Sequence, residues 1–223
     1  MKLSKSNILF VGLALIILII AGYYIFKTAP LKNLPADFLL RVPFSAQAPT
    51  DNWSRNEDCE ETSLVMANAF LNGNTVERLT ASTTQAAINY LKKWEQANLG
   101  YNADTGASAT TKMAQDGLGL KVKQIKDYTE ADLKTALVKG HPVLLPINAK
   151  LLGSPQYLLD GPTYHMIVIK GFKGHTFIVN DPGTDGGAGN EYTFTILRQA
   201  SADWNNAAKT MDPTRKMALI ISK

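Results

Sequence analysis

Cys59 is the single cysteine of the 223-residue chain, and its surroundings suit a nucleophilic thiol. An apolar face from Leu64 to Leu71 follows it and Gly73 supplies a stop, which predicts a helix starting near Cys59. Asp58 and Glu61 have the spacing of a capping box, so we expect Asp58 to be the N-cap. Cys59 would then lie in the first turn, where helix N–H groups and partial positive charge favour the thiolate, the nucleophilic form.

Acidic neighbours of Cys59 act against this ionisation. The carboxylates of Asp58, Glu60 and Glu61 oppose a negative sulfur. A cationic partner, most simply a histidine, would have to offset them. The alternative interpretation is that Cys59 is only a small buried apolar residue.

Three histidines could supply the base, and their contexts differ. His141 follows a helix-stop glycine and His175 sits at a hairpin turn, so both are expected at the surface or in loops. His165 opens an apolar strand over residues 164–172. A histidine at the mouth of a strand can point into a cleft while the strand fixes its position, so His165 is the candidate base.

An orienting group for His165 is expected from the strand that returns after the hairpin. That strand ends in Asn180-Asp181-Pro182, so either Asn180 or Asp181 can approach His165 across the ladder. Cys59, His165 and Asp181 would then provide nucleophile, base and orienting group. The alternative is that residues 181–183 form only a turn.

The pattern of the remaining chain predicts an α+β fold, with a helical first part packed on an antiparallel sheet formed later in the chain. Helices are expected over about 59–72, 82–100, 112–118, 129–139 and 201–208, the fourth with a capping box of Thr129 and Asp132. Strands are expected over 122–125, 142–147, 164–172, 175–180, 191–197 and 217–221, with Lys173-Gly174 as a hairpin turn.

Five blocks taken together resemble one known family. They are VPFSAQAP, CEETSLVMA, GHPVLLPI, YHMIVIKGF and FIVNDPGT, spread over about residues 42–183. Their order and spacing are similar to the C39-like branch of the papain-like cysteine peptidases. The resemblance implies a papain-like fold, with Cys59 as nucleophile, His165 as general base, Asp181 as third member and Gln47 as oxyanion donor.

The residues implied by the resemblance form a consistent set for amide cleavage. Attack on a carbonyl builds negative charge on oxygen, to which the Cys59 N–H and the Gln47 amide could donate. His165 would take the thiol proton and return it to the leaving amine, while Asp181 fixes the imidazole tautomer. The chain departs from the family pattern after Cys59, where Glu60-Glu61 replace a small, glycine-containing segment.

The N-terminus predicts a membrane anchor. Residues 8–26 contain no charge and are long enough to cross a bilayer as one helix. No clear cleavage site follows, so an uncleaved signal-anchor is favoured over a cleaved signal peptide. We expect a short tail over 1–7 inside the cell, a tether over 27–38, and the peptidase domain over 39–223 outside the cytoplasm.

Composition argues against other classes of partner. Without Lys2 and Lys5, the chain has 21 basic against 19 acidic residues, which gives no reason to expect nucleic acid. Residues 181–192 resemble a calcium loop weakly but lack two of its oxygen ligands, and there is no H-E-x-x-H motif. No metal or cofactor is therefore expected.

The sequence thus favours a membrane-anchored extracytoplasmic cysteine peptidase that acts on peptide or protein. A single unpaired thiol in an exported domain suits such chemistry. Two alternatives stay open: a papain-like cell-wall amidase or acyl or amide transferase, and a surface binding domain with an inactive site.

Overall fold

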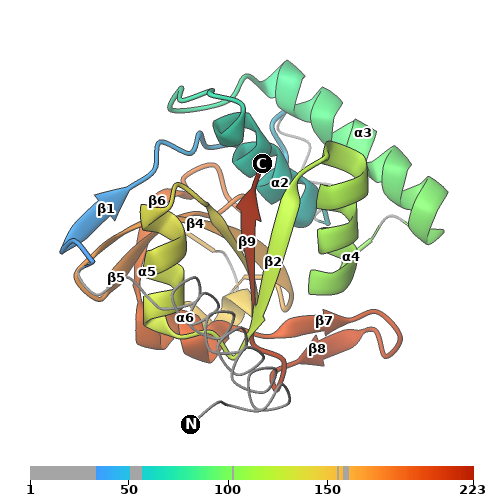
Figure 1. The fold of residues 1–223 in the computed structure, drawn as a ribbon. Helices are drawn as coiled ribbons and strands as arrows, with labels where there is room; N and C mark the ends of the chain where they lie inside the picture. The colour runs from blue at the N-terminus through green and yellow to red at the C-terminus, as the bar shows by residue number, and fades with distance from the viewer. Residues whose placement is uncertain (1–33, 51–56, 102, 155, 158–160) are drawn as a thin grey trace, which may run out of the picture. The chain divides into compact units, whose positions relative to one another are not determined.

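Apolar segments from the second half of the chain form most of an antiparallel sheet (Figure 1). The computed structural model describes residues 34–50, 57–101, 103–154, 156–157 and 161–223. Within these residues the seven strands of the sheet are β1 (Asp37–Leu39), β2 (Lys121–Lys126), β3 (Val143–Ile147), β4 (His165–Lys173), β5 (Thr176–Asn180), β6 (Ala188–Thr193) and β9 (Met217–Ser222). They lie in the order β2-β9-β3-β4-β5-β6, and β1 also pairs with β4. A separate hairpin is formed by β7 (Asp203–Asn205) and β8 (Thr210–Asp212).

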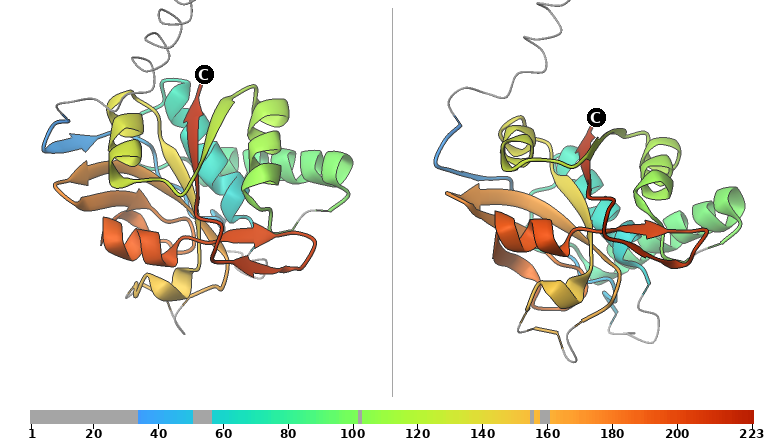
Figure 2. Two further views of the ribbon diagram at one scale, coloured as in Figure 1. Left: turned by 60° about the horizontal axis from the view of Figure 1, so that its bottom comes forward. Right: turned by 90° about the horizontal axis from the view of Figure 1, so that it is seen from below.

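The helices come mainly from the first half of the described chain. They are α2 (Cys59–Leu71), α3 (Ala81–Leu99), α4 (Ala107–Lys112), the π-helical turn η1 (Met113–Gly117), α5 (Glu130–Val138), the short η2 (Ala149–Leu151) and α6 (Phe194–Ala200). Figure 2 shows α2, α3 and α4 together on one side, away from α6. α2 packs against α3 and against β4. The predicted α+β arrangement, helices first and an antiparallel sheet later, is therefore confirmed for this part of the chain.

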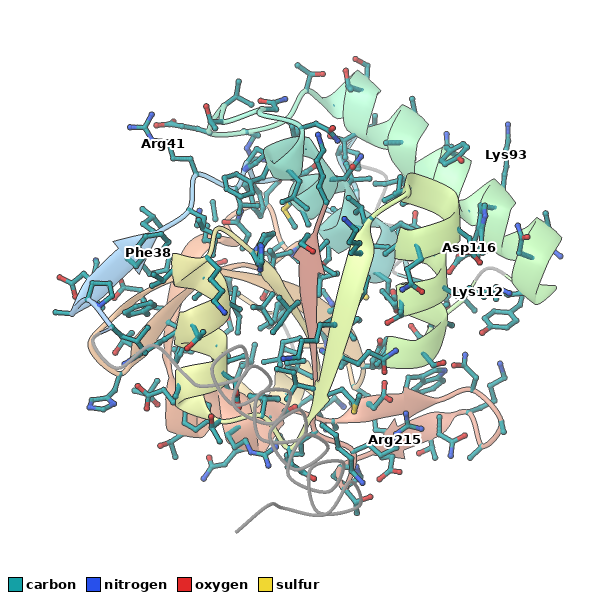
Figure 3. The ribbon with its side chains drawn as sticks, viewed as in Figure 1. Phe38, Arg41, Lys93, Lys112, Asp116 and Arg215 are labelled. Carbon is teal, nitrogen blue, oxygen red and sulfur yellow. The ribbon has the colours of Figure 1, made fainter. Side chains whose placement is uncertain are left out.

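The central strands are buried along nearly their whole length, which explains their continuous apolar sequences. Every residue of β3 is buried, and so are His165 to Ile169 of β4. A strand covered on both faces needs no polar alternation. The ring of Phe38 on β1 (labelled in Figure 3) stacks on Phe172, and the centroids are 6.4 Å apart. The sheet therefore holds β4, and with it His165, rigidly in the centre of the domain.

Several local predictions were correct. Thr129 and Asp132 form the expected capping box at the start of α5. α3 ends at Leu99, before Gly100 in the left-handed conformation. The hairpin of β4 and β5 is also present, although Lys173 pairs with Thr176 and the turn is therefore Gly174-His175.

Other local predictions were wrong because tertiary or capping contacts prevailed. The strand expected over 191–197 stops at Thr193, whose hydroxyl accepts the N–H of Ile196 and starts α6. The helix expected over 201–208 is instead β7 and the turn after it. The last residues of the predicted tether belong to the sheet, since Asp37 to Leu39 pair with β4.

The predicted membrane helix over 8–26 lies outside the described residues. Of the helices in the described ranges, none has the length and apolar character needed to cross a bilayer.

Candidate active site

Cys59 is the first residue of α2, as the sequence predicted, and its side chain is buried. Asp58 is the N-cap residue, but its side chain does not cap the helix, so the predicted capping box is wrong. The Asp58 carboxylate instead binds Lys92 of α3, with Nζ 2.6 Å and 2.9 Å from the two oxygens. An ion pair between helices thus replaces the local cap, and it neutralises one of the three carboxylates near the sulfur.

Hydrogen bonds tie the start of α2 to the start of β4. One turn after Cys59, the Ser63 hydroxyl donates to the carbonyl of Met166 at 3.2 Å. On the other side of His165, the Tyr164 hydroxyl donates to the Thr105 carbonyl at 2.6 Å. The Thr105 N–H in turn donates to Glu60, also at 2.6 Å. Both neighbours of His165 are therefore linked to the segment that carries Cys59.

His165 and Asp181 form a buried hydrogen-bonded pair. His165 Nε2 lies 2.7 Å from Asp181 Oδ1. The Asp181 carboxylate also accepts the Tyr157 hydroxyl at 2.8 Å and the Gly183 N–H at 2.9 Å. Burial alone would raise the pKa of Asp181, but the charge of His165 and these three donors hold it below its ordinary value. Asp181 is thus kept as a carboxylate facing the imidazole.

Asn180, the other residue considered beside His165, has a different role. Its amide Nδ2 donates to the carbonyls of Val42 and Pro43 at 3.1 Å and 3.2 Å. Its side-chain oxygen accepts the N–H of Gly189 at 3.3 Å. Asn180 therefore fastens the segment at 42–43 to the sheet while Asp181 contacts His165.

Gln47 is buried at the end of the same segment. Its backbone N–H donates to the carbonyl of Pro182 at 2.8 Å, directly after Asp181. Two sequence blocks more than a hundred residues apart are thus joined at 42–47 and 180–182. This brings the Gln47 backbone beside the residue that contacts His165.

The electrostatic surroundings of Cys59 favour the protonated thiol. Cys59 Sγ donates to Glu60 Oε2 at a distance of 2.9 Å. Burial, the charge of Glu60, this hydrogen bond and the charge of Asp104 together raise the pKa of the thiol well above its ordinary value. The opposition from carboxylates that the sequence indicated is therefore present, and the charge and the hydrogen bond of Glu60 are the two largest carboxylate causes.

Glu61 of α2 and Glu95 of α3 form a second pair of buried carboxyls. Burial raises the pKa of Glu61 to about 7, although its hydrogen bond with Glu95 works in the other direction. Burial, followed by the charge of Glu61, raises the pKa of Glu95 to about 10. At neutral pH, Glu95 is therefore protonated.

The remaining histidines lie elsewhere. His175 is 86% exposed at its side chain, and its Nδ1 is 2.9 Å from Glu130 Oε1. His141 is partly buried, and burial lowers its pKa. Neither is joined to Cys59 in the described structure, and those residues contain no group of three or more His, Cys, Asp or Glu side chains that could hold a metal ion.

Sequence reasoning missed three contributors to this site: Glu60 as the acceptor of the thiol proton, Tyr157 as a donor to Asp181, and Thr105 as the link between Tyr164 and Glu60. Glu60 was recognised only as an opposing charge. Tyr157 and Thr105 lie in segments without helical or strand periodicity, so no local signal marked them.

Comparisons with known proteins identify the family of this chain. Residues 39–211 match the model of the Peptidase_C39 like family. A crystal structure from Bacillus anthracis, described as a C39-like peptidase, is 18% identical, covers 84% of this chain and 98% of its own, and has a TM-score of 0.54. At this identity the likeness shows the fold. A comparison with curated protein sequences found no match.

Two further solved structures are similar at lower scores. The double glycine motif protease of an AMS/PCAT transporter, in complex with the leader peptide, is 16% identical, covering 82% of this chain and 93% of its own with a TM-score of 0.42. The cysteine protease CMS1MS2 of Carica candamarcensis, in complex with E-64, is 13% identical, covering 85% and 99% with a TM-score of 0.42. Neither likeness supports a conclusion about this chain. The match over residues 39–211 does: the chain belongs to the Peptidase_C39 like family of cysteine peptidases.

Proposed function

We propose that this protein is a membrane-anchored cysteine peptidase that cleaves peptide or protein amide bonds outside the cytoplasm. Cys59 is the nucleophile, His165 the general base and Asp181 the orienting carboxylate. The observation that carries the proposal is the buried 2.7 Å hydrogen bond of His165 with Asp181, on a strand whose first residues are bonded to the helix of Cys59.

The tautomer of His165 follows from this bond. Because Nε2 donates to Asp181, Nδ1 is the nitrogen that accepts the thiol proton. The sulfur then attacks the amide carbon, and the carbonyl oxygen gains the negative charge. The Cys59 N–H at the start of α2 and the Gln47 side-chain amide donate to that oxygen.

Completion of the reaction uses the same imidazole twice. Protonated His165 gives its proton to the leaving amine as the C–N bond breaks, which leaves a thioester on Cys59. Water, deprotonated by His165, attacks the thioester and releases the acid product and the thiol. Asp181 stabilises the imidazolium in both halves. The hydrogen bond of the thiol with Glu60 has to open before the first step, because the same proton moves to His165.

Location at the membrane is proposed from the N-terminal sequence. The charge-free residues 8–26 anchor the protein, with the catalytic part outside the cytoplasm. The substrate is then a peptide or protein that reaches the outer face of the membrane.

One observation favours a second candidate, a surface binding domain with an inactive site. Cys59 Sγ is held by Glu60, and its pKa is raised. A thiol fixed in this form reacts slowly. The two candidates therefore differ in whether Cys59 reacts and whether peptide bonds are cut.

The experiment combines an activity-based peptidyl probe for thiols with cleavage of a peptide library by the full chain. We expect the wild type to be labelled and to cleave, and Cys59→Ala to do neither. His165→Ala should lower both rates by a factor of about 10² to 10⁴, the contribution typical of general acid–base catalysis. His175→Ala is the matched control and should keep wild-type rates. An unreactive Cys59 in a folded wild type that cuts no peptide would leave the binding domain as the function.

A further inference from the structure

A cavity of about 410 Å³ is lined by residues that neighbour the proposed nucleophile and base in the chain. Its lining includes Glu57, two residues before Cys59, and Tyr164, which precedes His165. It also includes Trp204 of β7. Pockets of this volume are large enough to hold a ligand side chain or a small ligand. In addition to burial, the charge of Asp104, which also lines the cavity, raises the pKa of Cys59, and the charge of His165 acts against the burial that raises the pKa of Asp104. The cavity therefore lies within electrostatic reach of both residues, where a bound substrate can enter it.

Carboxylates give the cavity a net negative charge. Glu57 and Asp104 both line it, and among the described residues no ion pair involves either one. Burial and the charge of Glu57 raise the pKa of Asp104 to about 6, so it is ionised at pH 7.5. Lys209 is the cationic side chain of the lining, and its Nζ lies 5.1 Å from the centroid of the Tyr101 ring. Two negative charges and one positive charge leave a surplus of one negative charge.

Aromatic rings form another wall of the cavity. The Tyr164 and Trp204 rings are 5.5 Å apart at their centroids and tilted by 37°. Tyr164 is buried and backs the Trp204 ring, which is only partly buried. The Trp204 ring suits the methylene stem of a long cationic side chain, and its face also attracts the cation itself. The Asp104 backbone is held beside them, because its carbonyl accepts the Asn206 amide at 2.9 Å.

We propose that this cavity, lined by Glu57, Asp104, Tyr164 and Trp204, is a substrate subsite that selects a lysine or arginine side chain next to the scissile bond. The proposal rests on the proposed peptidase function and adds its substrate class: peptides with a basic residue. Lys209 occupies the same charged space and competes with the incoming cation.

The test measures kcat/KM of the full chain on matched peptides that carry lysine, norleucine or glutamate at each position around the scissile bond. Norleucine keeps the stem of lysine and removes the charge. At one position the kcat/KM of the wild type should be about tenfold higher for lysine than for norleucine, because the lysine cation meets one aromatic ring and two partly exposed carboxylates. The double variant Glu57→Gln/Asp104→Asn should bring this ratio close to one, and Lys209→Gln should raise it.

Asp116→Asn is the matched control for removing a carboxylate. Asp116 is an exposed residue of η1, labelled in Figure 3, and does not line the cavity. This variant should keep the wild-type ratio of lysine to norleucine. Equal cleavage of lysine and norleucine peptides at every position would overturn the subsite while the peptidase function stands.

A second measurement covers the case in which no peptide is cut, where the proposed function fails. The single thiol can be modified with methanethiosulfonates of equal length, one bearing a trimethylammonium group and one neutral. The cationic reagent should react with Cys59 about fivefold faster than the neutral one, and the double variant should abolish the difference. Equal rates of Cys59 modification by the two reagents in the wild type would overturn the subsite even if no peptide is cut.

Discussion

Replacing Glu60 by glutamine tests the origin of the low reactivity that the structure indicates for Cys59. The substitution removes a carboxyl whose Oε2 lies 2.9 Å from the sulfur, and it changes the size of the side chain very little. Burial, followed by the charge of Glu61, raises the pKa of this carboxyl well above its ordinary value, so the effect is reckoned from the hydrogen bond and not from a full negative charge. The glutamine carbonyl can still accept the Thr105 N–H, which binds Glu60 Oε1 at 2.6 Å. Its amide would then face the sulfur as a donor, which favours the thiolate. The pKa of Cys59 should therefore fall.

The size of the effect follows from the energy of the lost hydrogen bond. A typical hydrogen bond contributes about 0.5–1.5 kcal/mol, which corresponds to a thiolate fraction about 2- to 13-fold higher without it. A less basic thiolate is also a weaker nucleophile, with a Brønsted coefficient of about 0.4–0.5. The alkylation rate of Glu60→Gln should thus exceed the wild-type rate by about 1.5- to 4-fold.

The assay is alkylation by iodoacetamide at pH 7.5, followed by intact mass. Since Cys59 is the single cysteine of the chain, every added mass reports this site. Glu61→Gln is the control, because the charge of Glu61 is the last of the causes that raise the pKa of Cys59. An equal or slower rate for a folded Glu60→Gln variant would refute the view that Glu60 holds the thiol in its protonated form.

Three further predictions concern the triad, the buried carboxyls and the anchor. Asp181→Asn should lower turnover by roughly 10⁴, the cost of the analogous change in a serine-protease triad, with an unchanged circular dichroism spectrum. Asn180→Ala should instead lower the free energy of unfolding by about 1–3 kcal/mol, because the carbonyls of residues 42–43 lose their donor. Full activity of Asp181→Asn would contradict the assignment of Asp181 as the third member of the triad. The pKa of Glu95 is raised from 4.5 to about 10, so between these pH values the folded chain keeps a proton that the unfolded chain releases. The free energy of unfolding should therefore fall as pH rises through this range, by about 1.4 kcal/mol per pH unit for one proton. Melting curves at pH 5.5 and 8.5 should show this loss in the wild type and much less of it in Glu95→Gln; equal pH dependence in both would count against a buried, protonated Glu95. Residues 8–26 should keep the protein in the membrane fraction after an alkaline wash, whereas release of a species that begins after Phe26 would indicate a cleaved signal peptide.

Features that depend on neighbouring residues were predictable from the sequence. The start of α2 at Cys59, the capping box of Thr129 and the hairpin of β4 and β5 all rest on patterns a few residues long. The hairpin also brings residues 180–181 back near His165, so the candidate site could be identified before the fold. The family blocks carried the same information, and the match over residues 39–211 confirmed the family.

Contacts between distant segments had no such signal. Asp58 was expected to cap its own helix, yet it pairs with Lys92, which is 34 residues away in the chain. Tyr157 and Asp181 are separated by 24 residues, and Glu60 and Thr105 by 45. A single sequence does not encode which of several polar groups meet once the helices pack on the sheet.

Whether Asn180 or Asp181 contacts His165 was determined by the tertiary structure and not by the local sequence. The sequence determined that one of these two residues would share a face with His165, because side chains alternate along a strand. A bulge between Ile169 and Gly171 shifts the register of β4 by one residue, so that Asn180 lies opposite Val168, on the other face from His165. Without the bulge, Asn180 would lie opposite Ile169 and on the face of His165. The bulge lies where the antiparallel pairing of β1 with β4 ends. The Lys170 carbonyl accepts the Leu40 N–H at 2.8 Å, and a Cβ on Gly171 would lie 2.6 Å from the Phe38 carbonyl oxygen. The shift in register that turns Asp181 toward His165 thus occurs beside β1, a strand more than a hundred residues earlier in the chain. No local pattern in the hairpin of β4 and β5 could have shown this shift.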